Sequence, residues 1–206
     1  PIASNAGLDV YENPIKGHTY VCTVDVARGV TKDYSAFVVL DVSKMPYKVV
    51  AKFRDNDIKP LLFPHTIEKV CNAYNHAHVL VETNDLGQQV AEALQFEIEY
   101  DNLLMTTQRG RAGQILGAGY SGRGSGFGVK MTKQIKKIGC SNIKTLVEGD
   151  KIIINDFNIV EEMSTFVRRG QSWQADEGNT DDLMMCLVIF GWLSNQPYFK
   201  EMTDTN

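Results

Sequence analysis

Residues 18–28, HTYVCTVDVAR, decide the fold expected for this chain. Apolar and polar residues alternate along the stretch, which is typical of a β-strand packed against a core. Two more β-rich segments follow, SAFVVLDV over residues 35–42 and YKVVAKFR over residues 47–54, joined by short polar connections. The simplest arrangement of the three segments is a run of successive antiparallel strands.

Beyond residue 60 the pattern changes to strands that alternate with helices. The apolar stretch HVLVE, residues 78–82, is typical of a strand covered on both faces in a mostly parallel sheet. The other expected elements are helices over 61–75, from Asn84 or Asp85 to about Phe96, over 133–148, over 156–169 and over 180–194, and strands over 102–106, 151–154 and, at an edge, 171–175. This order predicts an α/β fold in which helices flank a mixed central β-sheet.

Three segments lie outside that pattern. Residues 1–17 are loose and polar, and we interpret them as a linker or the trimmed edge of a larger protein. One domain is then expected over residues 18–195, followed by a C-terminal tail over 196–206. The glycine-rich residues 107–128 predict an irregular surface loop.

Composition narrows the class of protein. With 206 residues, 43% of them hydrophobic, the chain can build one sizeable core. The net charge of −4 gives no overall attraction for a polyanion, so a nucleic-acid partner would need a local basic patch. The sequence shows no signal peptide, no apolar run that could span a membrane and no P-loop motif. We therefore expect a protein that is not secreted and has no membrane partner.

The four cysteines, Cys22, Cys71, Cys140 and Cys186, are scattered and form no CxxC pair. This spacing argues against a zinc ribbon or a dithiol redox site. Cys22 and Cys186 lie in apolar runs and are expected to be buried free thiols. A reducing intracellular setting follows as the default.

Acidic residues occur at three places where a rigid element would project them. Asp25 lies inside a hydrophobic strand, Glu82 ends another, and Asp181 and Asp182 open an apolar helix. Each has an ordinary explanation alone, because a strand can be half exposed and acids cap helices. Together they would supply the hard oxygen ligands that Mg²⁺ prefers, and one or two such ions can promote phosphodiester cleavage. The sequence therefore predicts a carboxylate metal site.

Neighbouring polar residues add little to this prediction. Asp33 follows the first strand and could reach the site across a hairpin, although turn formation is the commoner role of such an acid. His76 and His78 straddle the start of a strand, where surface or capping roles are the ordinary ones. No histidine cluster points to a different metal chemistry.

A basic surface is expected beside the acids. Lysines recur at helical spacing near residue 133, and arginines punctuate the glycine-rich segment before them. Charge runs are usually only solvated faces, but here they contrast with an acidic protein, and glycines let the backbone approach a phosphate. Sequence-independent DNA contact is the interpretation. The candidate DNA-binding residues are Arg109, Arg111, Arg123, Lys130, Lys133, Lys136 and Lys137.

Five segments of the chain together resemble a known family. They are VDVARG (24–29), DYSAFVVLDV (33–42), VLVETND (79–85), GVKMTKQIKKIGCSNIKTLVEGDKIII (128–154) and SWQADEGNTDDLMMCLVIFGWLS (172–194). The pattern resembles the C-terminal nuclease domain of the large terminase subunit of tailed bacteriophages over nearly all of residues 18–195. The resemblance implies a ribonuclease H-like fold and Mg²⁺- or Mn²⁺-dependent cutting of concatemeric double-stranded viral DNA.

The resemblance also implies roles and partners. Asp25 matches the catalytic aspartate of the first strand, Glu82 the glutamate that ends the fourth strand, and Asp182 the aspartate of the last helix, with Asp181 a close second metal ligand. In this family an N-terminal ATPase domain of the same polypeptide drives DNA into the procapsid, and the partners include the portal protein and the small terminase subunit. Viral assembly places the protein in the host cell cytoplasm.

Two function classes follow. The first is a metal-dependent DNA endonuclease with little sequence specificity, since nothing resembles a recognition helix. The second is a non-catalytic module that docks on or tracks DNA within a packaging motor. An actin-like ATPase also opens with a hairpin that bears Asp, but its second lobe needs more residues than this chain has.

Overall fold

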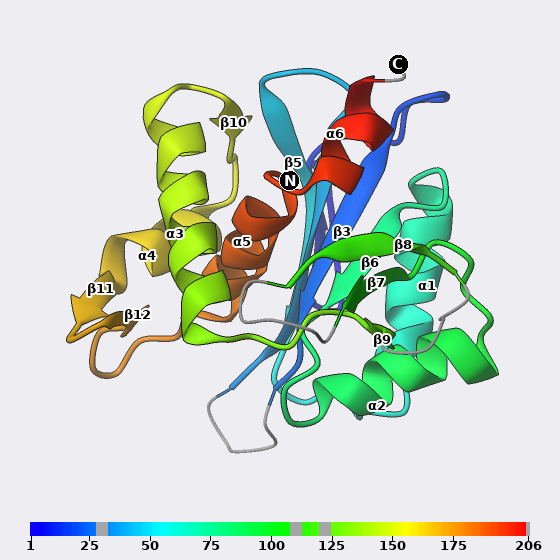
Figure 1. The fold of residues 1–206 in the computed structure, drawn as a ribbon, viewed down its shortest axis with the longest axis horizontal. Helices are drawn as coiled ribbons and strands as arrows, with labels where there is room; N and C mark the ends of the chain where they lie inside the picture. The colour runs from blue at the N-terminus through cyan, green and yellow to red at the C-terminus, as the bar shows by residue number, and fades with distance from the viewer. Residues whose placement is uncertain (28–32, 108–112, 120–124, 205–206) are drawn as a thin grey trace.

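The computed structural model describes residues 1–27, 33–107, 113–119 and 125–204, and its centre is a mixed β-sheet (Figure 1). The strand order across the sheet is β1 (Ala3–Asn5), β2 (Leu8–Val10), β5 (Tyr47–Asp55), β4 (Ser35–Asp41), β3 (Tyr20–Asp25) and β6 (His78–Val81), with β10 (Ile152–Ile153) paired to β5. Strands β3, β4 and β5 run antiparallel to their neighbours in sequence, as predicted. Strand β6 is parallel to β3, so their carboxyl ends lie at the same edge of the sheet.

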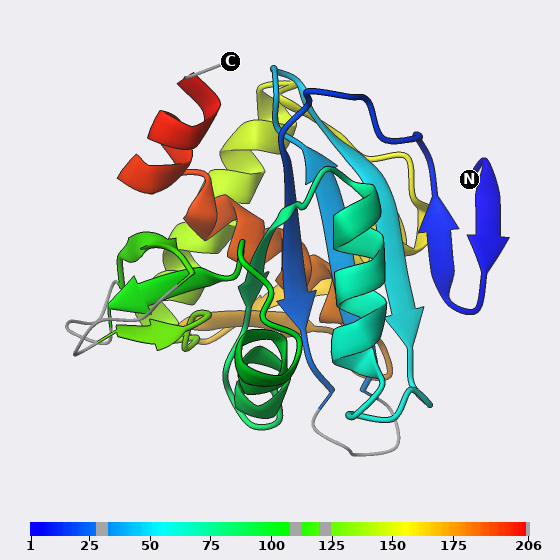
Figure 2. The same ribbon diagram turned by 90° about the vertical axis from the view of Figure 1, so that its right-hand side faces the viewer.

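Helices cover both faces of this sheet (Figures 1 and 2). On one face lie α1 (Phe63–Ala73) and α2 (Gly87–Glu92), the latter continued by a π-helical turn over Ala93–Glu97. On the other face lie α3 (Lys133–Glu148), α4 (Phe157–Thr165) and α5 (Asp182–Leu193). Alternate residues of β3 serve the two cores: Cys22 packs toward α1, and Val21 packs toward α5. The predicted α/β class with a mixed, helix-flanked sheet is confirmed.

Helix α5 is the central helix of its layer and is buried along its whole length. It crosses α3 closely because glycines face each other at the contact. A Cβ on Gly139 would lie 2.2 Å from the backbone oxygen of Val188, and one on Gly191 would lie 2.3 Å from the oxygen of Gly139. On the sheet side, Thr23 Oγ1 donates to the backbone oxygen of Cys186 (2.8 Å). The glycine contacts hold α5 close to α3, and the hydrogen bond from Thr23 holds it against β3.

Side-chain caps explain where two helices begin. Thr132 accepts a hydrogen bond from Ile135 N (3.2 Å) at the start of α3, and Asp156 accepts one from Ile159 N (2.7 Å) at the start of α4. Helix α3 has the bounds that the sequence predicts. Helix α4 is shorter than the predicted 156–169, because residues from Phe166 onward leave the helix and form a strand.

Part of the N-terminal segment has regular secondary structure. Strands β1 and β2 form a hairpin that extends the sheet beside β5 (Figure 2). Buried Lys52 of β5 binds this hairpin through Asp9 (3.0 Å), and on its other side reaches Asp156 (3.6 Å) and Asn158 (2.7 Å). Backbone pairing, the ion pair between Lys52 and Asp9, and the packing of Leu8 and Val10 against the core attach the hairpin.

The glycine-rich segment 107–128 is also more regular than predicted where the structure describes it. Strands β8 (Ile115–Ala118) and β9 (Ser125–Phe127) flank β7 (Leu104–Thr107) in a small antiparallel sheet. The predicted edge strand at 171–175 is β12 (Ser172–Ala175), which pairs with β11 (Phe166–Arg169) as a separate hairpin. The sequence did not reveal β8 and β9, because glycines interrupt the apolar alternation and strands pair through backbone hydrogen bonds.

Helix α6 (Pro197–Asp204) occupies part of the expected tail and buries Phe199 in the core beside α5. Cys22 and Cys186 are buried and free, as predicted. Within the described ranges, no helix has both the length and the apolar character needed to cross a membrane. The division into linker, domain and tail stays a prediction.

Candidate active site

Two carboxylates meet at the edge of the sheet where β3 and β6 end. Asp25 is the last residue of β3, and Glu82 follows β6 directly. The parallel pairing places Val24 opposite Val81, and Glu82 N donates to the backbone oxygen of Val24 (2.9 Å). Parallel strands thus bring two acids together that are far apart in sequence.

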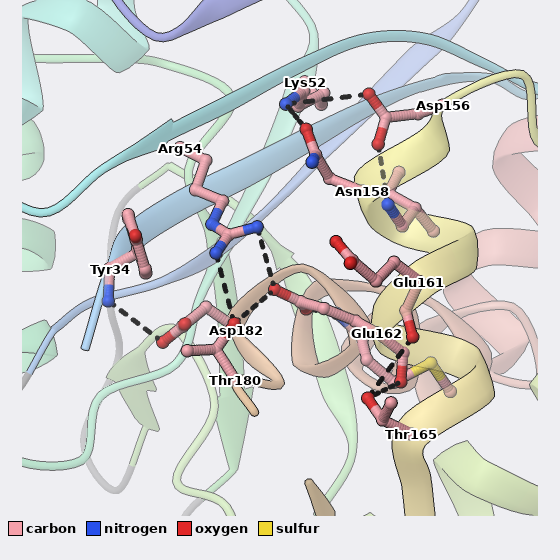
Figure 3. A network of polar contacts seen from close by, with 12 residues as sticks. Tyr34, Lys52, Arg54, Asp156, Asn158, Glu161, Glu162, Thr165, Thr180 and Asp182 are labelled. Carbon is pink, nitrogen blue, oxygen red and sulfur yellow. Dashed lines mark hydrogen bonds and ion pairs between the residues drawn. The ribbon is translucent and has the colours of Figure 1, made fainter. Parts of the chain in front are cut away.

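The start of α5 brings two further acids to the same edge. Asp182 is the first residue of the helix, and its Oδ1 accepts a hydrogen bond from Tyr34 N (3.2 Å) (Figure 3). Asp181 precedes the helix, and its Oδ2 accepts one from Ala175 N (3.0 Å) in β12. The backbone partners orient both carboxylates from outside the helix.

These four acids line one pocket of about 320 Å³. The structure therefore brings together Asp25, Glu82, Asp181 and Asp182, as the sequence interpretation required. Asp33, left undecided between a turn and the site, lines the pocket as well. The remaining lining residues are Val26, Ala27, Asn84, Asp85, Met131, Lys136, Gln174 and Met185.

Burial and mutual repulsion change the titration of the acids. Burial raises the pKa of Asp25 well above its usual value, and the charges of Glu82 and Asp182 raise it further. A hydrogen bond between the Asp25 and Glu82 carboxyls also favours the protonated form. Burial raises the pKa of Asp182 to about 7, with the charge of Glu162 the next cause. The pocket therefore concentrates negative charge that is unfavourable without a cation.

The donors fit a hard divalent cation. Carboxylate oxygens are the ligands that Mg²⁺ prefers, and the repulsion just described would be relieved by a positive ion. Asn84 adds a neutral oxygen: its Nδ2 donates to Met131 O (3.3 Å), while its Oδ1 is buried with no protein partner in the described chain. Among those residues, no set of three or more His, Cys, Asp or Glu forms a finished metal site.

The basic residues divide into three groups. Lys136, on α3, lines the carboxylate pocket, and Lys130 lines a second pocket of about 400 Å³ beside the small sheet. Lys133 and Lys137 are exposed on α3. Arg109, Arg111 and Arg123 lie outside the described residues. Of the lysines, Lys136 is thus the one that the structure places beside the acids.

Sequence reasoning missed the residues that support the acids. Arg54 of β5 and Glu162 of α4 contact each other and the start of α5 (Figure 3). Glu162 lies on a helix beside Glu161, which is exposed, so its sequence context gives no signal. Arg54 gave no signal either, because β5 carries three other charged residues, Lys48, Lys52 and Asp55.

The fold and the site define a class of protein. A mixed sheet with acids at the ends of two adjacent parallel strands and at the start of a buried helix describes a ribonuclease H-like α/β domain. The profile of the family described as "Terminase RNaseH-like domain" matches residues 22–189. The chain therefore belongs to the terminase ribonuclease H-like family, as the resemblance implied.

Solved structures show the same fold. The large terminase nuclease of thermophilic phage G20c, crystallised with bound magnesium, is 20% identical with a TM-score of 0.69, over 92% of this chain and 88% of that chain. A form of the same nuclease with bound zinc has a TM-score of 0.66 at 20% identity, over 94% and 91% of the two chains. The large terminase nuclease domain of Thermus phage P74-26 is 19% identical with a TM-score of 0.65, over 90% and 84%.

Proposed function

We propose that this chain is the metal-dependent endodeoxyribonuclease domain of a viral DNA-packaging terminase and cuts double-stranded DNA with little sequence specificity. The convergence of Asp25, Glu82, Asp181 and Asp182 on one pocket carries the proposal. Family membership supports it, and so do the metal ions in the related phage G20c nuclease structures. Mg²⁺ or Mn²⁺ is the proposed cofactor.

Each residue has a part in this chemistry. A bound divalent cation supplies charge neutralisation at the phosphate and a more acidic water. Asp25 and Glu82, fixed on adjacent strands, and Asp182, with Asp181 as a further ligand, would hold the cation. Lys136 lines the same pocket and would attract the phosphate of the DNA backbone.

The wider surface for DNA rests on the basic residues. Lys130 beside the second pocket and the exposed Lys133 and Lys137 extend positive charge from Lys136. Contacts of this kind bind backbone phosphates and read no sequence. We include Arg109, Arg111 and Arg123 in the proposed DNA-binding set on their sequence position.

The biological setting is proposed from family membership. In this setting the N-terminal ATPase domain of the same polypeptide, the portal protein and the small terminase subunit are partners, and the protein acts in the host cell cytoplasm during viral assembly. Co-purification of the full polypeptide with its portal protein tests the assembly part. Failure to co-purify under packaging conditions would count against that part and leave the cleavage proposal intact.

The decisive test is a plasmid-nicking assay. The wild-type chain should convert supercoiled DNA to nicked and linear forms in Mg²⁺ or Mn²⁺ and be inactive in EDTA. Asp25→Asn should abolish cleavage while DNA binding persists. Asp176→Asn is a matched control, because Asp176 is exposed and pairs with Arg169 (2.6 Å) away from the pocket. DNA binding without any cleavage by the wild type would instead favour the non-catalytic docking module.

A further inference from the structure

The N-terminus of α5 is not capped by its own acids. Asp181 holds the N-cap position, yet it makes no side-chain capping hydrogen bond. Its carboxylate accepts from Ala175 N in β12, and that of Asp182 accepts from Tyr34 N. Both are of a residue type well suited to bind the free N–H groups of a helix. In this chain they face the pocket, so another group must satisfy the helix.

Glu162 of α4 satisfies it. Its Oε2 accepts a hydrogen bond from Met184 N (2.9 Å), and its Oε1 accepts one from Thr180 Oγ1 (3.0 Å). Met184 is the third residue of α5, where an N-cap side chain normally accepts its bond. Glu162 is only 3% exposed. Its carboxylate thus performs the capping role from a different helix.

Arg54 fixes Glu162 in that position. Its Nη1 lies 3.5 Å from Glu162 Oε1, and its Nη2 donates to Thr180 Oγ1 (3.2 Å). The guanidinium also stacks on the ring of Tyr34, 4.0 Å from its centroid, and the backbone of Tyr34 binds Asp182. Figure 3 shows Arg54 between Tyr34 and the Glu162–Thr180 pair. One cation therefore contacts both the cap of α5 and the segment that orients Asp182.

We propose that Glu162 and Arg54 are positioning residues of the carboxylate pocket: Glu162 caps α5 from α4, and this leaves Asp181 and Asp182 free to bind metal. The inference rests on the proposed function, because it concerns the same site. Within the described chain Glu162 does not line the pocket, so it acts through α5 and not as a ligand. Without this cap, an aspartate at the helix start would turn to the free N–H groups.

If Arg54 acted through its charge alone, its removal would have the opposite effect on cation binding. Removing a positive charge beside an acidic pocket should strengthen cation binding if only the electric field matters. Removing a positioning residue should weaken it, because the carboxylates lose their orientation. Changes to groups that orient metal ligands typically cost about 10–100-fold in affinity. Arg54 is therefore the decisive position, whereas loss of the negative Glu162 weakens binding under both views.

The experiment measures Mn²⁺ binding by electron paramagnetic resonance of the free ion, with no DNA present. We expect Arg54→Met to bind Mn²⁺ at least about tenfold more weakly than the wild type. Ile67→Val is the control for lost stability, because Ile67 lies on α1 and is buried in the core on the other face of the sheet; the Mn²⁺ affinity of this variant should be unchanged. Equal or tighter binding by a folded Arg54→Met would overturn the proposal. Should that variant not fold, Arg54→Lys keeps the charge but loses the forked contact, and the same weakening is expected.

A second measurement reads the cap directly. Hydrogen exchange at the Met184 amide, followed by NMR, should accelerate in Glu162→Met, which has no side-chain oxygen to accept from Met184 N, relative to the wild type and to Ile67→Val. Unchanged exchange would refute Glu162 as the cap. Should the wild type bind no Mn²⁺ and cut no DNA, the proposed function fails, and the Met184 exchange still decides the capping role.

Discussion

Replacing Asp182 with Asn should stabilise the metal-free protein at alkaline pH. Asp182 is 8% exposed and lies among other acids, and this burial and the neighbouring charges raise the pKa of its carboxyl from the usual 3.8 to about 7. Asn is nearly isosteric, and its Oδ1 can still accept the hydrogen bond from Tyr34 N. The substitution removes a charge that is unfavourable in this pocket and keeps the shape of the side chain.

The sign and size of this stability gain follow from proton linkage. Between about pH 4 and pH 7 the folded protein binds this proton and the unfolded chain does not, so stability falls as pH rises through that window. Above pH 7 the ionised Asp182 imposes its full cost on the free energy of folding. A shift of about three units corresponds to about 4 kcal/mol, which is an upper limit. The helix N-terminus offsets about 0.3–1 kcal/mol of it by favouring the anion. We therefore expect Asp182→Asn to gain about 1–3 kcal/mol at pH 8.

Urea unfolding in EDTA measures the effect. The gain should be present at pH 8 and vanish below about pH 4, where the carboxyl is neutral in both states. Asp176→Asn is the control: this exposed carboxylate has its pKa lowered by a backbone hydrogen bond and by Arg169, so its removal should bring no gain. Adding Mn²⁺ should stabilise the wild type more than the variant. An Asp182→Asn protein no more stable than the wild type at pH 8 would refute the view that burial and neighbouring acids disfavour the charge of Asp182.

Three further predictions concern the surroundings of the pocket. Lys136→Gln should lower plasmid cleavage more than Lys137→Gln, because Lys136 lines the pocket and Lys137 is exposed; equal losses would contradict this. Gly139→Ala should lower the free energy of unfolding by about 1–3 kcal/mol in urea titrations, since its Cβ would lie 2.2 Å from a backbone oxygen of α5. Gly87→Ala should weaken Mn²⁺ binding in calorimetry, because its Cβ would lie 1.7 Å from the backbone oxygen of Glu82; unchanged affinity would show that the strand end can move freely.

Two charged residues of β5 connect the start of α5, beside the pocket, with the N-terminal hairpin. Arg54 and Lys52 lie two residues apart on β5, and both reach α4: Lys52 contacts Asp156 at its start, and Arg54 contacts Glu162 within it (Figure 3). Lys52 also binds Asp9 of the N-terminal hairpin. The side chains of Lys52 and Arg54 thus link the hairpin, α4 and the helix that carries Asp182.

The amino-acid sequence by itself determined the main strands and helices and the acids at their ends. Alternation in β3, the apolar run of β6 and the apolar composition of α5 are local patterns. They placed Asp25 inside a strand, Glu82 at the end of a strand, and Asp181 and Asp182 at the start of a helix. Local patterns suffice for this because strand and helix periodicity are written in neighbouring residues. The strands of residues 1–17 and 107–128 were missed because pairing between backbones leaves little trace in side-chain composition.

Only the tertiary structure decided which groups support the acids. Arg54, Glu162 and Asp182 come from a strand, a helix and the start of another helix, and no spacing in the chain relates them. Arg54 and Glu162 meet because α4 and α5 pack on the same face of the sheet, where the half-buried cation and the buried anion satisfy each other. The raised pKa of Asp182 likewise depends on burial and on neighbours brought by folding, which are properties of the packed molecule alone.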